Sequence, residues 1–216
     1  MFEDDGLQAR RLRAAPPSPR GLAPLDRFAA SHGFGRSWPP IELSRASPAS
    51  VVSMDASIRE YRPADQTDVL DLSLRAWGPI FASMENVLGR EIYTRLHGHD
   101  WRAYQSNSVK DVLADPAIQV WVGENISGNV VGFAAAKIVD TDRRLGEIVM
   151  VAVDPSASGR GLGTALTQHA TEWLRAQGMQ TAMIETGGDA GHAAGRRTYE
   201  KAAYTLMPIA RYFKAL

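Results

Sequence analysis

Residues 148–178 read IVMVAVDPSASGRGLGTALTQHATEWLRAQG and predict a buried strand, a glycine-rich turn and an amphipathic helix. The apolar run Ile148–Val153 stops at Asp154-Pro155, as expected of a central strand covered on both faces. After the turn, one face of a helix is marked by Leu162, Ala165, Leu166, His169, Ala170, Trp173 and Leu174. Gly178 stands where a helix commonly ends.

The turn Ser158–Thr164, SGRGLGT, predicts an anion site. Its glycines (Gly159, Gly161 and Gly163) have no Cβ, so an anion can approach the backbone closely. The first amides of the following helix have no intrahelical partner, and the helix dipole adds positive potential there. Arg160 adds a permanent charge. These features favour a phosphate ligand over a turn that only permits close packing.

Two nucleotide-binding motifs compete for this turn. A P-loop requires Lys directly after its glycines, and none is present, so that reading fails. A dinucleotide fingerprint matches at Gly159 and Gly161, with Glu185 downstream as its acid. Thr164, however, replaces the last glycine, and five residues separate Val153 from the motif. An NAD-dependent oxidoreductase therefore stays open as a weak alternative.

A third reading is a resemblance. The turn resembles the acyl-CoA pyrophosphate loop of the GNAT superfamily of N-acyltransferases, which is written [Q/R]-x-x-G-x-[G/A]. Here a strand is followed by Asp-Pro and by a loop that ends in Arg160-Gly161-Leu162-Gly163 before a helix. Ser158 departs from the expected Gln or Arg, with a weaker cofactor site as the implied consequence. Tyr199–Tyr204, YEKAAY, resembles the family's Y-E-K-x-G-[FY] segment, with Ala203 in place of Gly. The resemblance covers residues 57–216.

The order of predicted elements agrees with that superfamily. A first strand at 58–62 is followed by helical stretches at 64–77, 80–88 and 91–110, broken at Gly78-Pro79 and continued to residue 113. Strands are expected at 118–123, 130–139, from Glu147 onward, at 181–186 and at 204–216, with a helix at 192–202. The implied fold class is α/β (α+β): a mixed, mostly antiparallel central sheet flanked by helices.

Residues 1–53 differ in composition from the rest of the 216-residue chain. They hold seven of its 12 prolines and no Lys, and we expect a disordered extension, with the acetyltransferase-like domain at 54–216. Met54 is favoured as the natural start. The zero formal net charge gives no reason to expect nucleic acid or membrane partners, and the lack of cysteine suits a cytoplasmic protein. A homodimer stays an open alternative.

The resemblance implies roles for individual residues. Acyl-CoA would lie where the central strand splays from the fifth strand, with backbone groups of Val151 and Val153 pairing with its pantetheine amides and the Val151 amide holding the oxyanion. The pyrophosphate would be held by the loop Ser158, Gly159, Arg160, Gly161, Leu162, Gly163 and Thr164. Glu147 is the candidate general base and Tyr199 the candidate acid for the leaving thiolate, each weighed against an ordinary structural role.

The implied reaction transfers an acetyl group from acetyl-CoA to a primary amine of a small molecule or peptide. Trp77, Phe81 and His192 are candidate acceptor contacts, although aromatic residues at helical spacing usually belong to a core. No metal is expected, because His97, His99 and Asp100 lack a convincing further ligand. A non-catalytic acyl-CoA sensor and a partner-binding module that acts through residues 1–53 remain alternatives.

Overall fold

The structure is a computed structural model that describes residues 56–216. The prediction of a disordered extension at 1–53 and of a natural start at Met54 therefore lies outside the described residues. The strands are β1 (Ala56–Glu60), β2 (Ile118–Asn125), β3 (Val130–Asp140), β4 (Leu145–Val153) and β5 (Thr181–Ile184). The helices are α1 (Gln66–His97), α2 (Trp101–Ala114), α3 (Leu162–Ala176) and α4 (Ala193–Lys201).

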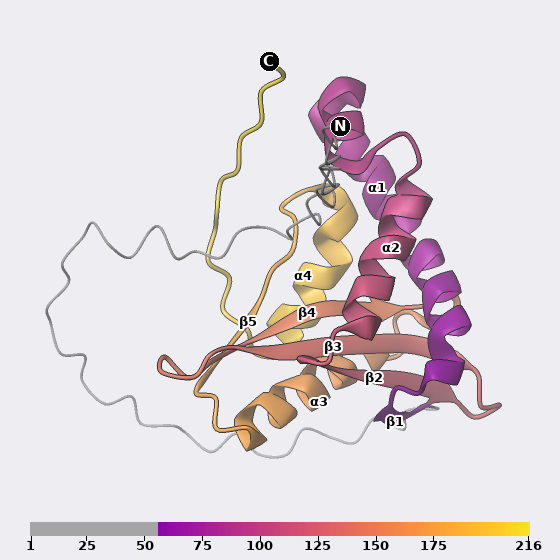
Figure 1. The fold of residues 1–216 in the computed structure, drawn as a ribbon, viewed down its shortest axis with the longest axis vertical. Coiled ribbons are helices and arrows are strands. Elements are labelled where there is room, and N and C mark those ends of the chain that lie inside the picture. Colours follow the sequence, from indigo (N-terminus) through magenta and orange to yellow (C-terminus); the bar gives the residue numbers. More distant parts are fainter. Residues whose placement is uncertain (1–55) are drawn as a thin grey trace, which may run out of the picture. The chain divides into compact units, whose positions relative to one another are not determined.

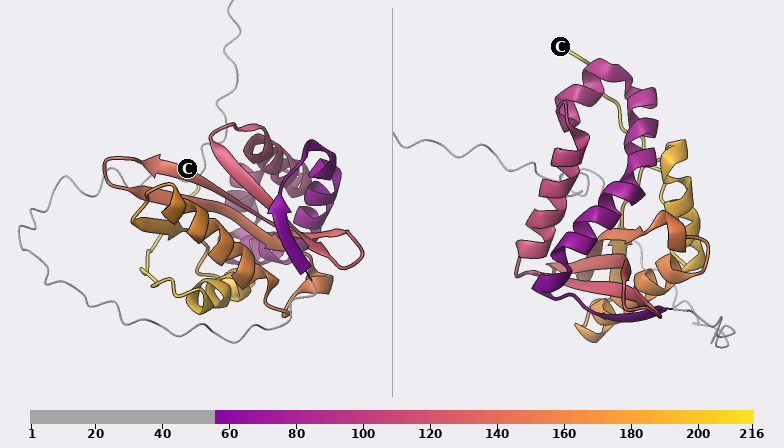
Figure 2. Two further views of the ribbon diagram at one scale, coloured as in Figure 1. Left: turned by 90° about the horizontal axis from the view of Figure 1, so that it is seen from below. Right: turned by 90° about the vertical axis from the view of Figure 1, so that its right-hand side faces the viewer.

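The described strands form one sheet in the order β1-β2-β3-β4-β5. Neighbouring strands are antiparallel from β1 to β4, whereas β4 and β5 are parallel because α3 connects them as a crossover (Figure 1). The predicted mixed, mostly antiparallel sheet flanked by helices is confirmed. Two views at right angles show α1 and α2 on one face of the sheet and α3 and α4 on the other (Figure 2).

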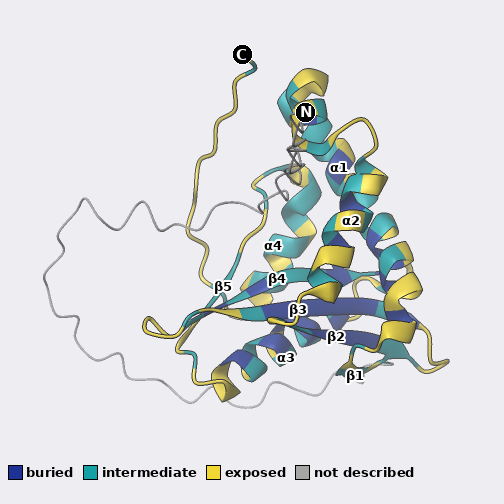
Figure 3. Cartoon of the chain, viewed as in Figure 1, coloured by how far each residue is buried: buried dark blue, intermediate teal, exposed yellow. Residues whose placement is uncertain are grey.

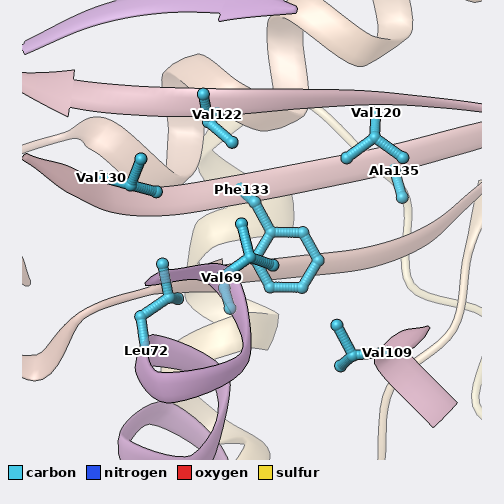
Figure 4. Close-up of a cluster of buried hydrophobic side chains, with 9 residues drawn as sticks. Val69, Leu72, Val109, Val120, Val122, Val130, Phe133 and Ala135 are labelled. Carbon is cyan, nitrogen blue, oxygen red and sulfur yellow. The ribbon is translucent and has the colours of Figure 1, made fainter. Parts of the chain in front are cut away.

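Each face of the sheet has its own core. Val69 and Leu72 of α1 and Val109 of α2 pack on Phe133 of β3 (Figure 4). On the opposite face the apolar side of α3 packs on Ala134 and its neighbours. The buried band runs along β2 and β3, which lie at the centre of the sheet (Figure 3). The two-sided burial explains why these strands read as nearly continuous apolar runs.

Three glycines bring α3 unusually close to the sheet: Gly123 of β2, Gly132 of β3 and Gly146 of β4. A Cβ at Gly123 would lie 2.9 Å from Leu162 Cδ1, and one at Gly146 would lie 2.3 Å from Leu174 Cδ2. The two leucines stand at opposite ends of α3. The glycines therefore seat both ends of the helix, and the start of α3 is held where β4 leads into the glycine-rich turn.

The predicted break at Gly78-Pro79 is wrong, because α1 continues through Pro79 to His97. Proline costs a helix one backbone hydrogen bond, and the packing of the buried Phe81, two residues further on, offsets that loss. The backbone departs from helical geometry at Gly89, where φ is 72°. Gly98, with φ 76°, ends α1, so the predicted helix over 91–110 is in fact the end of α1 and most of α2.

The predicted last strand at 204–216 is also wrong. Residues 205–216 follow the turn after α4 without forming helix or strand. Leu206, Met207 and Tyr212 of this segment are largely exposed. An alternating apolar pattern forms a strand only where another strand offers a ladder of hydrogen bonds, and within residues 56–216 none pairs with this segment.

Candidate active site

The two parallel strands pair over only part of their length. Leu145–Ile148 of β4 pairs with Thr181–Ile184 of β5, where β5 ends, whereas β4 continues to Val153. From residue 149 to 153 the β5-facing edge of β4 therefore has no strand beside it in the described structure. Val151 and Val153 lie in this open stretch, where an extended ligand can pair with the backbone as an added strand.

A β-bulge lies where the open stretch begins. Ala135 pairs with Met150 and Ala136 with Ile148, so Val149 is the extra residue of β4. A bulge bends a strand and changes the direction of its side chains and amides. The irregularity of β4 therefore coincides with the end of its pairing to β5.

The segment after β4 is fixed by Asp154. Its buried carboxylate accepts hydrogen bonds from the Ser156 backbone N–H at 2.9 Å and from the Arg75 Nε at 2.7 Å. Burial favours the neutral acid, yet the hydrogen bonds from Ser156 and Arg75 keep the pKa of Asp154 below its usual range. The Ser158 hydroxyl donates to the Asp154 carbonyl at 3.2 Å. Ser158 thus has a structural bond in the loop that leads toward the glycines.

The glycines then turn the chain into α3. Gly159 has φ 80° and Gly161 has φ 89°, backbone angles that residues with a Cβ rarely adopt. No atom lies within 4 Å of the position a Cβ would take at either residue, so this side of the turn is open. The open turn, the free amides of the first turn of α3 and the exposed Arg160 together fit an anionic group.

Gly163, at the start of α3, packs closely against α4. A Cβ there would lie 3.4 Å from Thr198 Cγ2 of α4 and 3.5 Å from Val153 Cγ2 of β4. The predicted cofactor loop, the open edge of β4 and the helix that carries Tyr199 therefore meet at one place. A strand, a loop and a helix that are separate in the sequence are brought together.

Among the predicted site residues, Tyr199 has the most strongly shifted pKa. Burial, helped by the neighbouring Tyr204, raises the pKa of Tyr199 to about 12. A Cβ at Gly195 would lie 3.7 Å from the Tyr199 hydroxyl and 3.7 Å from Thr186 Oγ1. The hydroxyl therefore points toward the start of α4 and the segment that follows β5. Among the described residues, no hydrogen-bond partner occupies it.

Glu147 lies in the paired part of β4. It stands opposite Lys137 of β3, with 3.2 Å between Lys137 Nζ and Glu147 Oε2, and opposite Met183 of β5. Strand alternation places it on the sheet face that α1 and α2 cover, since Gly146 and Ile148 face α3. Among the described residues, no hydrogen bond or ion pair joins Glu147 to Tyr199, the two predicted catalytic residues.

The predicted acceptor residues differ in exposure. Phe81 is 2% exposed and stacks on Trp101 with ring centroids 4.8 Å apart, and Trp77 packs near Phe133. Both contribute to packing around α1, and their acceptor role stays a prediction.

His192 pairs through Nδ1 with Asp189, whose other oxygen accepts from Ser83 at 2.5 Å. Sequence reasoning missed Asp189 and Ser83, although the Asp-x-x-His spacing at a helix start was a local signal.

Two further properties follow from the described residues. Within 56–216, no group of three or more His, Cys, Asp or Glu side chains is placed to hold a metal ion. Asp100 instead caps α2, where it accepts from the backbone N–H groups of Arg102 and Ala103. None of the helices in this part of the chain has the length and apolar character needed to cross a membrane.

Comparison with known proteins supports the reading of the loop. The model of the acetyltransferase (GNAT) family matches residues 84–204. Mycothiol acetyltransferase of Amycolatopsis mediterranei is 33% identical over 119 residues, which cover 49% of this chain and 38% of that protein. The corresponding enzyme of Tsukamurella paurometabola is 29% identical over 172 residues, which cover 76% and 53%. The chain thus spans about half, or less, of the length of these curated relatives.

Solved structures share the fold at low sequence identity. Aminoglycoside N-acetyltransferase AAC(6')-Iy in complex with CoA is 13% identical, with a TM-score of 0.52 over 74% of this chain and 94% of that one. The apo aminoglycoside 6'-N-acetyltransferase of Acinetobacter haemolyticus gives a TM-score of 0.53 at 13% identity, over 74% and 98%. Because the family model spans more than half of the sequence, including the glycine-rich turn and the Tyr199 segment, this chain belongs to the GNAT family of acetyltransferases.

Proposed function

We propose that this enzyme transfers the acetyl group of acetyl-CoA to a primary amine. The observation that carries the proposal is the continuity between the open edge of β4 and the glycine-rich turn at the start of α3. An extended amide-containing chain that ends in a pyrophosphate would meet strand-like backbone groups along residues 149–153 and then an anion site. Acetyl-CoA has this order of groups and supplies an activated thioester.

The binding roles follow from that order. Backbone groups of Val151 and Val153 would pair with the pantetheine amides, and the Val151 amide would stabilise the developing oxyanion. Amides of Ser158–Thr164 and the Arg160 guanidinium would hold the pyrophosphate. Ser158 already donates its hydroxyl to the Asp154 carbonyl, so the loop shape does not depend on the Gln or Arg usual at that position.

Tyr199 is the proposed proton donor to the leaving sulfur. Its raised pKa keeps the hydroxyl protonated throughout the neutral range. The same shift makes it a weaker acid than an ordinary tyrosine, and a thiol has a reference pKa of about 8.5. Proton transfer to a fully formed thiolate would be uphill, so the Tyr199 proton should move as the carbon–sulfur bond breaks. Glu147, the base predicted from the sequence, forms an ion pair with Lys137.

The acceptor is proposed only as a class. The curated relatives are named mycothiol acetyltransferases, and this chain matches about half of their length or less. A primary amine on a small molecule or on a peptide is consistent with the family. A non-catalytic acyl-CoA sensor remains the second candidate, since it would use the same loop and strand edge.

A thermal-shift titration of the whole chain with acetyl-CoA, CoA and NAD tests cofactor choice. A ligand that binds only the folded state raises the unfolding midpoint as it saturates. We expect a rise with both CoA species and none with NAD. A rise with NAD alone would refute the proposal and revive the dinucleotide reading.

Turnover is then measured as thiol release from acetyl-CoA with glucosamine, kanamycin, putrescine and a peptide that has a free N-terminus. Release with any of these amines supports the enzyme. Tight acetyl-CoA binding without thiol release, with these amines or with water as acceptor, would favour the sensor.

A further inference from the structure

Three side chains from distant parts of the sequence form a hydrogen-bonded group, which we name the His192 cluster: Ser83 of α1, and Asp189 and His192 of the short turn before α4. The Asp189 carboxylate accepts from Ser83 Oγ at 2.5 Å, from the Gly191 backbone N–H at 3.0 Å and from His192 Nδ1. The three side chains are thus connected in the order Ser83, Asp189, His192.

The segment that carries the cluster is held firmly. Arg196 of α4 donates from Nη1 to the carbonyls of Gly187 and Asp189 at 2.5 and 2.9 Å. Gly191 lies against α1, where a Cβ would approach Ser83 Cβ to 2.6 Å and the Ile80 backbone to 3.1 Å. Gly187 has no room for a Cβ either, because Asp189 and His192 pack on it. His192 therefore has a defined position between α1 and α4.

The hydrogen bonds also determine which nitrogen of His192 is available. Although burial favours the neutral acid, hydrogen bonds from Ser83 and His192 hold the pKa of Asp189 below its usual range, so the group is a carboxylate. A carboxylate only accepts hydrogen bonds, so Nδ1 carries the proton and Nε2 has a free lone pair. Nε2 has no hydrogen-bond partner among the described residues. His192 caps no backbone group of α4 with its side chain.

Helix geometry directs His192 and Tyr199 to one region. His192 stands directly before α4 and Tyr199 lies within it, seven residues later. A spacing of seven returns to the same face of a helix. The Tyr199 hydroxyl reaches back toward Gly195, which lies between them. Both side chains lie against the segment that follows β5, because His192 packs on Gly187, and a Cβ at Gly195 would lie 3.7 Å from both the Tyr199 hydroxyl and Thr186 Oγ1.

We propose that His192, oriented by Asp189, is the general base that removes a proton from the acceptor amine. The inference rests on the acetyl transfer proposed above. Ser83 extends from α1, which also carries the predicted acceptor contact Trp77, so the cluster links that helix to the helix of Tyr199. Asp189 and Ser83 act through His192 and are positioning residues.

The proton balance is complete without another reactant. The ammonium of the acceptor loses one proton to His192 Nε2, and its nitrogen lone pair then forms the C–N bond with the thioester carbonyl. As the C–S bond breaks, the sulfur takes the Tyr199 proton, and the nitrogen loses its second proton, which restores Tyr199 through water. His192 finally releases its proton to solvent, so amide, free CoA thiol and one proton are formed.

The acid–base groups around the imidazole are few. Asp189 contacts it directly, Arg196 lies on the carbonyls of the same turn, and Tyr199 follows on α4. From α1 the contact is the uncharged Ser83. Glu147, the base predicted from the sequence, is paired with Lys137 instead.

The test compares pH profiles of kcat/KM for the whole chain and its variants, by thiol release with the amine from the set above that reacts fastest. His192→Gln should lower kcat/KM about 100-fold, as expected for loss of a general base, and should remove the acid limb. Asp189→Asn should shift that limb to lower pH, because the lost negative charge no longer favours the imidazolium. His99→Gln, at an exposed histidine outside the site, is the matched control and should leave the profile unchanged.

The outcomes separate this inference from the proposed function. If the unaltered chain does not bind acetyl-CoA, the proposed function fails. If it binds and reacts but His192→Gln keeps the acid limb, or Glu147→Gln alone removes it, the inference is overturned. If no amine reacts, acetyl-CoA hydrolysis and NMR titration of His192 replace the amine assay. An imidazole pKa that does not change in Asp189→Asn would then overturn it, and a fall would support it.

Discussion

Arg75 of α1 forms an ion pair with Asp154, the residue directly after β4, with 2.7 Å between Nη2 and Oδ2. The pair joins α1 to the start of the segment that leads into the glycine-rich turn. The two sides differ in environment, because the Asp154 side chain is 10% exposed and that of Arg75 is 53% exposed. Loss of the carboxylate and loss of the guanidinium should therefore lower the free energy of unfolding by unequal amounts.

Asp154→Ala should destabilise the fold by about 2 kcal/mol, because it removes a turn cap together with a buried charged hydrogen bond. Arg75→Ala should cost no more than about 1 kcal/mol, since its charge is half exposed. Urea unfolding measures both. Arg90→Ala, which breaks an exposed pair with Glu85 at 3.9 Å, is the control and should change nothing measurable. Equal effects of the first two variants would contradict the assignment.

The same carboxylate predicts a pH dependence. The pKa of Asp154 is lowered in the folded protein, so the unfolded chain binds more protons once the pH falls to the ordinary range of Asp. Its stabilisation is complete above that range and is lost as the pH falls through the folded pKa. Urea unfolding between about pH 6 and pH 3 should show a smaller acid loss in Asp154→Ala than in the unaltered chain. Parallel curves would refute this prediction.

Gly161→Ala should weaken acetyl-CoA binding while the domain remains folded. The residue has φ 89°, where a Cβ costs about 1–2 kcal/mol, and the strain falls on the turn proposed to present amides to the pyrophosphate. Gly128→Ala is a matched control, because Gly128 has φ 77° and equal open space in the β2–β3 turn. Both variants should lose similar stability, and only the first should lose the thermal shift with acetyl-CoA.

Tyr199→Phe should lower kcat about 100-fold with little change in acetyl-CoA affinity, because it removes only the proton donor. Tyr204→Phe is the control. The Tyr204 hydroxyl lies 2.7 Å from Thr171 Oγ1, so this variant should lose about 1 kcal/mol of stability and keep its turnover. Unchanged kcat in Tyr199→Phe would exclude Tyr199 as the acid.

The raised pKa of Tyr199 also predicts how the stability of the fold changes at alkaline pH. Its pKa is raised to about 12, so its contribution to stability is complete below the ordinary tyrosine range near 10 and is lost as the pH rises toward 12. Tyr199→Phe cannot ionise and should lose less stability over that interval. Urea unfolding at a series of alkaline pH values measures the difference.

Gly146→Ala should destabilise the domain by about 1–3 kcal/mol through overpacking, because its Cβ would overlap Leu174 of α3. Gly188→Ala, where nothing lies within 4 Å of the new Cβ, should be close to neutral. Chemical unfolding compares the two. If Gly146→Ala is also neutral, α3 does not depend on the close contact with β4.

The sequence by itself determined the features that depend on neighbouring residues. The apolar run ending at Asp154-Pro155, the glycines that permit positive φ and the helical spacing from Leu162 to Leu174 specify strand, turn and helix locally, and the structure confirms all three. The mixed sheet and the GNAT family followed from the resemblance of the glycine-rich loop and of Tyr199–Tyr204 to that family's motifs, together with the order of the segments. Site roles assigned from them, such as those of Glu147 and Tyr199, stay predictions.

Only the tertiary structure decided which distant groups meet. Ser83 and Asp189 are 106 residues apart in sequence, and no local pattern predicts their hydrogen bond. Pro79 stays within α1 because packing compensates for a lost backbone bond, and the apolar segment 205–216 forms no strand because none of the strands described in 56–216 pairs with it. Local propensity decides what a segment can become, whereas partners supplied by the fold decide what it does become.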